Sequence, residues 1–157
     1  MAGSMAFARL LTLGIPALLL AGAYLGQYGF GLYPCEMCWW QRYPHFAAFA
    51  LAALAFVFPP QRLWIALAAL AILISGLIGA FHAGVEYGWW EGITTCSTTV
   101  QAASGKDVLD AILNAPLIRC DVAPWTLFGI SLAGYNFLIS CGGALTVFGL
   151  LAKGKGA

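Results

Sequence analysis

Charged residues are scarce in this sequence. Its 157 residues include 7 lysines and arginines and 6 aspartates and glutamates, together 8%, while 62% of the residues are apolar. Soluble domains carry about 25% charged residues, so the composition excludes an ordinary soluble domain. A formal net charge of +1 gives no reason to expect nucleic acid as a partner. The composition is that of a membrane protein.

The sequence also lacks the ligand spacings of a structural zinc site. It contains one Cys-X-X-Cys motif, Cys35 to Cys38, with neither a second such motif nor a His-X3-His pair. Zinc needs four ligands, so the motif is better explained as a redox pair than as half of a zinc site. No internal repeat divides the chain, and we expect a single domain over residues 1–157.

Four apolar runs are each long enough, or nearly so, to cross a hydrocarbon core that needs about 20 helical residues. The first lacks a small-x-small cleavage site, which favours a membrane span over a removed signal peptide. We place the spans at residues 5–24, 39–58, 63–82 and 124–151. The short connections between the first three predict an all-α membrane protein, a four-transmembrane-helix bundle of up-down topology.

The few charges predict the orientation of this bundle. All six acidic residues fall on one side of it, and Arg9, Arg62, Lys153 and Lys155 fall on the other. The positive-inside rule then makes both termini cytoplasmic. Four cysteines face the outer, oxidising side, where disulfides persist: Cys35, Cys38, Cys96 and Cys120. We expect the remaining one, Cys141, to be a small packing residue inside the fourth span.

The spacing of Cys35 and Cys38 brings two sulfur atoms within bonding distance. If a helix begins near Cys35, Cys38 and Arg42 share one face near its positive N-terminal end. Lowering a thiol pKa by about 1.5 units takes roughly 2 kcal/mol. A guanidinium about 5 Å away supplies about 3 kcal/mol at an effective dielectric near 20. Arg42 is therefore enough to favour the thiolate, although a snorkelling interface arginine is the simpler alternative.

Pro44 complicates this geometry. Proline disfavours helical backbone at the residue before it, here Tyr43, which favours a later start of the regular helix.

A second cysteine pair occupies the long loop over residues 83–123. Cys96 and Cys120 most simply form a disulfide, closing a ring of about 25 residues and stabilising the fold by roughly 3 kcal/mol. Such a pair is usually structural, but two pairs on one membrane face can also exchange disulfides. Between them, a capping box at Ser104–Asp107 predicts a short amphipathic helix over Val108–Asn114. This helix lies on the membrane surface or packs over the bundle mouth.

A membrane dithiol must pass its electrons to an acceptor. The sequence has no flavin or further metal signature, so a lipid-soluble quinone is the simplest acceptor. Arg42 would stabilise negative charge there. His82 would hydrogen-bond a quinone carbonyl or handle its protons, unless it is a satisfied interface histidine, and we expect His45 to serve packing. Four tryptophans suit an interface belt or, alternatively, the wall of a quinone pocket: Trp39, Trp40, Trp89 and Trp90.

These features resemble the disulfide bond formation protein B (DsbB) family, quinone reductases of the bacterial inner membrane that reoxidise the periplasmic thiol oxidase DsbA. The resemblance is carried by six motifs: Cys35–Cys38, Gln41-Arg42, His82 ahead of Cys96, Cys120, Pro124-Trp125 and Phe128-Gly129.

The resemblance implies a relay in which a reduced DsbA-like partner attacks the Cys96–Cys120 disulfide at Cys96. Cys120 then engages Cys35 and releases Cys38, whose thiolate donates to ubiquinone or menaquinone beside Arg42 and His82. The loop helix would correspond to the membrane-associated helix of the family.

Three matters stay open at this point. A vitamin K epoxide reductase-like enzyme also couples a Cys-X-X-Cys motif to a quinone, but it carries the motif late in its bundle. A non-enzymatic tetraspan scaffold stapled by disulfides predicts an unreactive Cys38. The resting disulfides are one of three possible pairings of four cysteines.

Overall fold

The computed structural model describes residues 2–94 and 118–153. They form four long helices: α1 (Ala2–Gly29), α2 (Glu36–Val57), α3 (Gln61–Glu86) and α5 (Leu132–Lys153). A short hairpin of β1 (Thr126–Leu127) and β2 (Ile130–Ser131) precedes α5. Cys96 and the expected loop helix at Val108–Asn114 lie outside the described residues.

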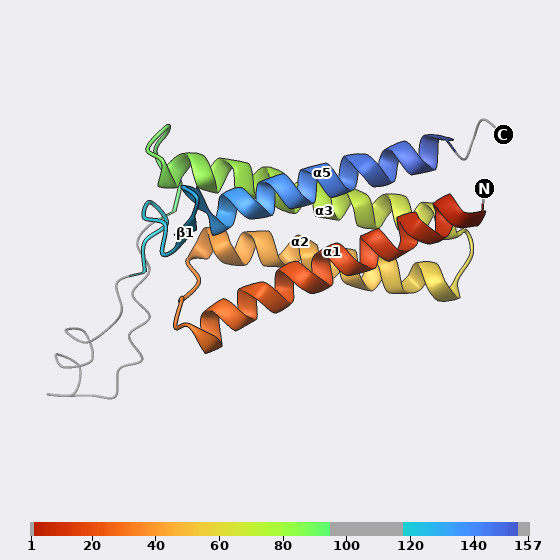
Figure 1. The fold of residues 1–157 in the computed structure, drawn as a ribbon, viewed down its shortest axis with the longest axis horizontal. Coiled ribbons are helices and arrows are strands. Elements are labelled where there is room, and N and C mark those ends of the chain that lie inside the picture. The colour runs from red at the N-terminus through yellow and green to blue at the C-terminus, as the bar shows by residue number, and fades with distance from the viewer. Residues whose placement is uncertain (1, 95–117, 154–157) are drawn as a thin grey trace, which may run out of the picture.

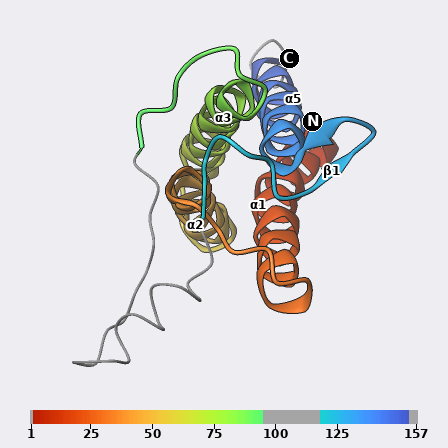
Figure 2. The same ribbon diagram turned by 90° about the vertical axis from the view of Figure 1, so that its left-hand side faces the viewer.

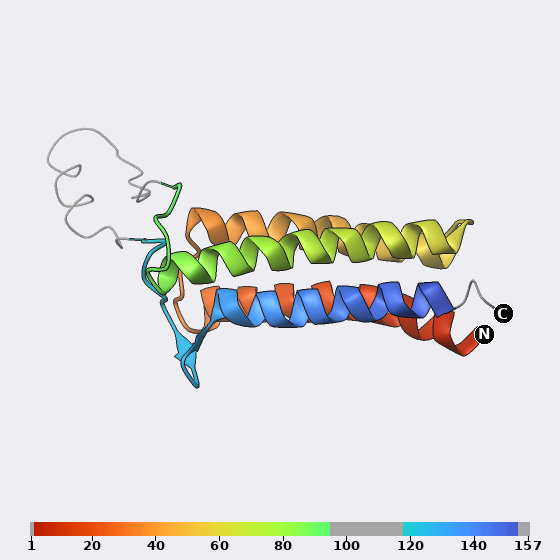
Figure 3. The same ribbon diagram turned by 90° about the horizontal axis from the view of Figure 1, so that it is seen from above.

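Successive helices run in opposite directions, and both ends of the chain lie at one end of the bundle (Figure 1). Seen from above, α2 and α3 form one layer and α1 and α5 the other (Figure 3). The end-on view shows the four helices at the corners of a square (Figure 2). The most extensive contacts join α3 to α5 and to α2. This is the up-down arrangement expected from the short connections.

Three helices, α1, α3 and α5, are long and apolar enough to cross a membrane by length and composition. The helix α2 has 22 residues, but its first half carries Glu36, Gln41, Arg42 and His45. These polar residues lower its hydropathy, and the last three are buried inside the bundle. That α2 also crosses the membrane therefore stays a prediction.

The start of α2 settles the question raised by Pro44. The helix begins at Glu36, one residue after Cys35, and continues through Pro44, so Cys38 and Arg42 lie one turn apart on one helix. Cys35 is the N-cap residue, and its sulfur accepts a hydrogen bond from the Cys38 amide at 3.3 Å. Capping of the first turn, together with packing against α1 and α3, outweighs the local preference of the proline.

The fourth long helix begins later in the sequence than the span expected at residues 124–151. Residues 124–131 are not helical, and α5 begins at Leu132. Phe128 and Gly129 have φ angles of 51° and 78° at the turn between β1 and β2. Two successive positive φ values are typical of a two-residue hairpin turn and are incompatible with a right-handed helix. Conversely, α1 and α3 extend beyond the expected spans, which places Glu86 on the last turn of α3.

A close approach of α3 and α5 depends on Gly76. A Cβ atom at this position would lie 2.7 Å from the sulfur of Cys141 and 3.1 Å from its backbone nitrogen. Cys141 thus packs at the helix crossing, as we expected of a small packing residue. Alanines supply much of the buried surface elsewhere in the bundle, and small residues of this kind let membrane helices pack closely.

We expect Gly76→Ala to lower the stability of the fold by about 1–3 kcal/mol, because overpacking forces the two helices apart. Gly142→Ala is the matched control: it lies beside Cys141, and nothing approaches its Cβ position within 4 Å. Thermal unfolding midpoints in one detergent compare the two variants. Equal midpoints would show that α3 and α5 are not tightly packed at Gly76.

Candidate functional site

The cysteine pair lies at the end of the bundle opposite the termini, where α2 begins. The two sulfur atoms of Cys35 and Cys38 are 3.0 Å apart, with Cys35 donating its hydrogen to Cys38. This hydrogen bond and burial raise the pKa of the Cys35 thiol above its ordinary value. When the reduced pair loses one proton, the remaining hydrogen therefore stays on Cys35, and the negative charge lies on Cys38.

A third cysteine lies against this pair. Cys120 and Cys35 are both buried in one small cluster with Met37 and Val85. The structure thus brings together three of the four cysteines singled out in the sequence, although Cys35 and Cys120 are 85 positions apart in it. Such proximity is what exchange of a disulfide between Cys120 and Cys35 requires.

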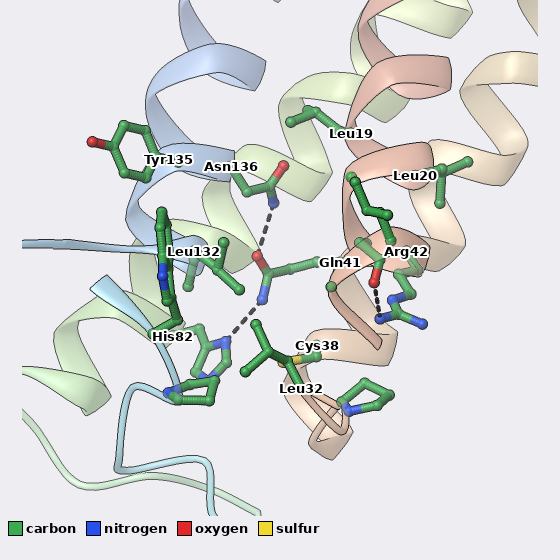
Figure 4. A pocket seen from close by; sticks show the side chains of 18 of the residues that line it. Leu19, Leu20, Leu32, Cys38, Gln41, Arg42, His82, Leu132, Tyr135 and Asn136 are labelled. Atoms are coloured by element: carbon green, nitrogen blue, oxygen red, sulfur yellow. Dashed lines mark hydrogen bonds between the residues drawn. The ribbon is translucent and has the colours of Figure 1, made fainter. Parts of the chain in front are cut away.

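Cys38 opens onto a cavity of about 710 Å³ between α1, α2, α3 and α5 (Figure 4). Most of the wall is apolar, with leucines of α1 and Leu132 of α5. Six charged, amide or imidazole side chains also line the cavity: Gln41, Arg42, His45, His82, Glu86 and Asn136. Of the tryptophans, Trp125 lines this cavity and the four named from the sequence do not.

Arg42 is 6% exposed and does not snorkel to the surface. Its guanidinium donates to the side-chain oxygen of Gln27 at 2.7 Å and to the carbonyl of Ala23 at 3.3 Å. It also lies over the rings of Tyr24 and Trp39, 5.0 and 4.9 Å from their centroids. All four of these partners are neutral, so they hold the guanidinium in place without cancelling its charge.

His82 lies between the cysteine pair and a buried carboxylate. Its Nε2 is 3.6 Å from the sulfur of Cys35 and 3.7 Å from Oε1 of Glu86. Its Nδ1 is 2.8 Å from the side-chain nitrogen of Gln41. The backbone of Cys120 also lies within reach of this ring. His82 is 2% exposed, and both of its ring nitrogens contact other side chains. It is therefore a residue of the site and not a residue of the membrane interface.

On the side of His82 away from the cysteine pair, polar side chains of three helices form one buried network. Asn136 of α5 donates to Gln41 of α2 at 2.8 Å and to the carbonyl of Ser75 in α3 at 3.1 Å. Its oxygen contacts Nε2 of His45 at 2.9 Å. A Cβ at Gly79 would lie 3.0 Å from the Asn136 nitrogen, so this glycine makes room for the network. The structural role expected for His45 agrees with this position.

Sequence reasoning missed Glu86, Asn136 and Ser75, and it assigned no role to Gln41. The available signal was weak: each is a polar residue within or at the end of an apolar helix. Such residues are costly in a membrane and usually mark a functional site. Their partners, however, lie on other helices, and nothing local in the sequence pairs them.

Comparisons with known proteins point to one family. The family model "Disulfide bond formation protein DsbB" matches residues 5–150. A disulfide bond formation protein B of Verminephrobacter eiseniae is 32% identical over 156 residues, 92% of this chain and 84% of its own length. One of Polaromonas sp. (strain JS666) is 32% identical over 155 residues, 90% of this chain and 86% of its own.

An uncharacterised protein of Rickettsia prowazekii is 24% identical over 136 residues, 84% of this chain and 79% of its own length. No solved structure matches. The family match covers nearly the whole chain, including the cysteine pair, the cavity and α5. The chain therefore belongs to the disulfide bond formation protein B family.

Proposed function

We propose that this protein is a membrane thiol:quinone oxidoreductase that reoxidises a periplasmic DsbA-like partner and passes the electrons to ubiquinone or menaquinone. Family membership supports a role in disulfide formation. The observation that carries the finer proposal is the position of Cys38. It belongs to a close thiol pair and also lines an apolar cavity that holds a buried arginine.

The cavity suits a quinone in size and chemistry. Its volume of about 710 Å³ lies within the usual range for small-molecule sites, roughly 300–1,000 Å³. A quinone supplies an acceptor for two electrons and two protons. The apolar wall would hold its ring and tail, while Arg42 and His82 would hold its carbonyl end. Arg42 keeps a positive charge beside Cys38, which stabilises negative charge developing there.

The cysteines would act in sequence. The partner's thiolate attacks Cys96, so that Cys120 leaves as a thiolate. Cys120 then attacks Cys35: the Cys120–Cys35 bond forms, the Cys35–Cys38 bond breaks, and the electron pair goes to Cys38. The burial of Cys120 and Cys35 in one cluster supports this second step. Cys38 is then the thiolate that faces the cavity.

The proposed orientation has four membrane spans, with both termini in the cytoplasm and the redox cysteines on the periplasmic side. Arg9, Arg62 and Lys153 gather at the end of the bundle that holds the termini, with Arg62 donating to the carbonyl of Leu151 at 2.5 Å. Glu36 and Glu86 lie at the other end, with the cysteines, as do Arg42, which is buried, and Arg119, which pairs with Asp121. The net positive charge therefore lies at the end that holds the termini, which supports the positive-inside assignment of the bacterial inner membrane.

The direct test is stopped-flow absorbance of the full-length protein, purified with bound ubiquinone and mixed with a reduced DsbA-like partner. We expect one quinone to be reduced for each partner dithiol oxidised. The same partner with alkylated thiols is the control and should leave the quinone oxidised. Absence of reduction with both ubiquinone and menaquinone would favour the disulfide-stapled scaffold instead.

A further inference from the structure

The role of His82 depends on which ring nitrogen carries its hydrogen. Nε2 faces the sulfur of Cys35 at 3.6 Å and Oε1 of Glu86 at 3.7 Å, while Nδ1 faces the side-chain nitrogen of Gln41 at 2.8 Å. A neutral imidazole has one donor nitrogen and one acceptor nitrogen. With the hydrogen on Nε2, His82 donates to Cys35. With the hydrogen on Nδ1, it can only accept from the thiol.

The orientation of the Gln41 amide decides between these forms. Its nitrogen also lies 3.2 Å from the carbonyl oxygen of Met37, which can only accept a hydrogen bond. Its oxygen lies 2.8 Å from the side-chain nitrogen of Asn136. Asn136 is oriented in the same way, because its nitrogen lies 3.1 Å from the carbonyl oxygen of Ser75. Two backbone carbonyls therefore fix both amides, and Gln41 presents N–H to His82.

It follows that the hydrogen bonds form one directed chain through the bundle. Asn136 donates to Gln41, Gln41 donates to Nδ1 of His82, and Nε2 of His82 donates to Cys35. The thiol of Cys35 donates in turn to the sulfur of Cys38. Hydrogen bonds that point the same way polarise one another, and every donor in this chain points toward Cys38. Figure 4 shows its inner links, from Asn136 through Gln41 to His82.

We infer that Gln41 is a positioning residue that holds His82 in its neutral, Nε2-protonated form and so directs this chain of hydrogen bonds toward a thiolate at Cys38. The inference deepens the proposed function, since it assigns the buried network to the stabilisation of the electron-donating sulfur. A reversed chain would need the Gln41 amide to turn. That would set oxygen against the Met37 carbonyl and N–H against the Asn136 amide.

The same orientation opposes capture of a metal ion. The sulfur atoms of Cys35 and Cys38 and a ring nitrogen of His82 lie within 4.8 Å of one another, a spacing that suits a shared metal. A metal would need the lone pair of Nε2, and the other ring nitrogen would then donate to an acceptor. Gln41 offers a donor there instead. The dithiol is thereby kept for redox chemistry.

The groups that face His82 come from each neighbouring segment. Cys35 and Cys38 face it from the start of α2, Glu86 from α3, and Cys120 from the segment before β1. Arg42 of α2 and Tyr135 of α5 line the same cavity. The oriented amide of Gln41 and the carboxylate of Glu86 face opposite ring nitrogens. Together they favour the same tautomer, with hydrogen on Nε2.

The first test is ¹⁵N NMR of the reduced, full-length protein in lipid nanodiscs with labelled histidine. The chain has 2 histidines, so a His45→Gln variant assigns the signals of His82. We expect a protonated-type shift at Nε2 and an unprotonated-type shift at Nδ1. In Gln41→Glu the carboxylate can only accept, so Nδ1 should become protonated. Hydrogen on Nδ1 in the wild type, or an unchanged spectrum in Gln41→Glu, would overturn the inference.

The second test is the rate at which Cys38 is alkylated in the reduced protein at neutral pH, read by mass spectrometry of its peptide. Gln41→Leu should lower this rate by about tenfold, the effect of one hydrogen bond to a charged group. Thr12→Val is the control: Thr12 is a buried polar residue of α1 whose hydroxyl donates to the carbonyls of Ala8 and Arg9, so the rate should stay unchanged. An equal rate in Gln41→Leu and wild type would overturn the inference. Neither test needs a quinone or a partner, so failure of the proposed function would not affect them.

Discussion

Replacing Cys38 by serine should reduce the rate of quinone reduction by at least about 1,000-fold, because nucleophile removal of this kind costs three orders of magnitude or more. Cys38 is the thiol of the pair that lines the cavity, whereas Cys35 is buried against Cys120. A serine hydroxyl stays protonated and cannot accept the electron pair of a broken disulfide. The measurement is stopped-flow absorbance of bound ubiquinone after mixing with the reduced partner.

The same variant should accumulate a disulfide between Cys35 and Cys120, because the Cys35 thiolate can attack Cys120 of the Cys96–Cys120 disulfide, which breaks and leaves Cys96 as the thiolate. With Cys38 absent, nothing within the Cys35–Cys38 motif displaces this bond, and Cys35 and Cys120 are already buried in one cluster. Mass spectrometry of unreduced peptides would detect the cross-link.

Cys141→Ser is the matched control, because Cys141 packs at the crossing of α3 and α5 beside Gly76. It should retain wild-type quinone reduction. Full activity in Cys38→Ser would contradict the relay, whatever the behaviour of Cys141→Ser.

Replacing Arg42 by methionine should lower kcat/KM for quinone by about 100- to 1,000-fold, the usual effect of removing one donor that stabilises developing negative charge. The guanidinium is buried beside the cavity and is held by Gln27, Ala23 and two aromatic rings. Methionine preserves much of the apolar stem but removes the charge. Steady-state kinetics with varied ubiquinone concentration gives the value.

Arg42→Lys tests whether charge alone is sufficient. Lysine keeps the charge but loses the planar fork that reaches Gln27 and Ala23 together, so we expect an intermediate loss. Arg62→Met is the control at the opposite end of the bundle, where Arg62 contacts the carbonyl of Leu151. It should leave kcat/KM for quinone unchanged. A loss in Arg62→Met as large as that in Arg42→Met would point to general destabilisation rather than a role at the cavity.

Much of the fold follows from local sequence properties. The scarcity of charge indicates a membrane protein, and the long apolar runs indicate its helices, three of which are apolar enough to span. The hairpin before α5 was missed because its residues are apolar and extend the following run without a break. The Phe128-Gly129 pair was the one local signal of a turn there.

Some residues of the site could likewise be assigned from the sequence, and others could not. Cys35, Cys38 and Arg42 could be assigned from the sequence because one helix carries them, and its 3.6-residue period places Cys38 and Arg42 on one face. Their catalytic roles stay predictions, and Cys96 lies outside the described residues. Cys120 was linked to Cys35 only through the family resemblance, and His82 was nominated as a residue type but not as a neighbour of Cys35.

The sequence by itself determined which segments are apolar, where helices form and which polar residues each helix carries on a given face. Only the tertiary structure decided which faces meet. Gln41 contacts Asn136 because Gly76 and Gly79 let α3 approach α5 closely, and His82 reaches Glu86 because α3 continues one turn farther than its apolar run. The physical reason is that helical periodicity is set by local backbone geometry. The rotation of each helix about its axis is set instead by packing against side chains far away in the chain.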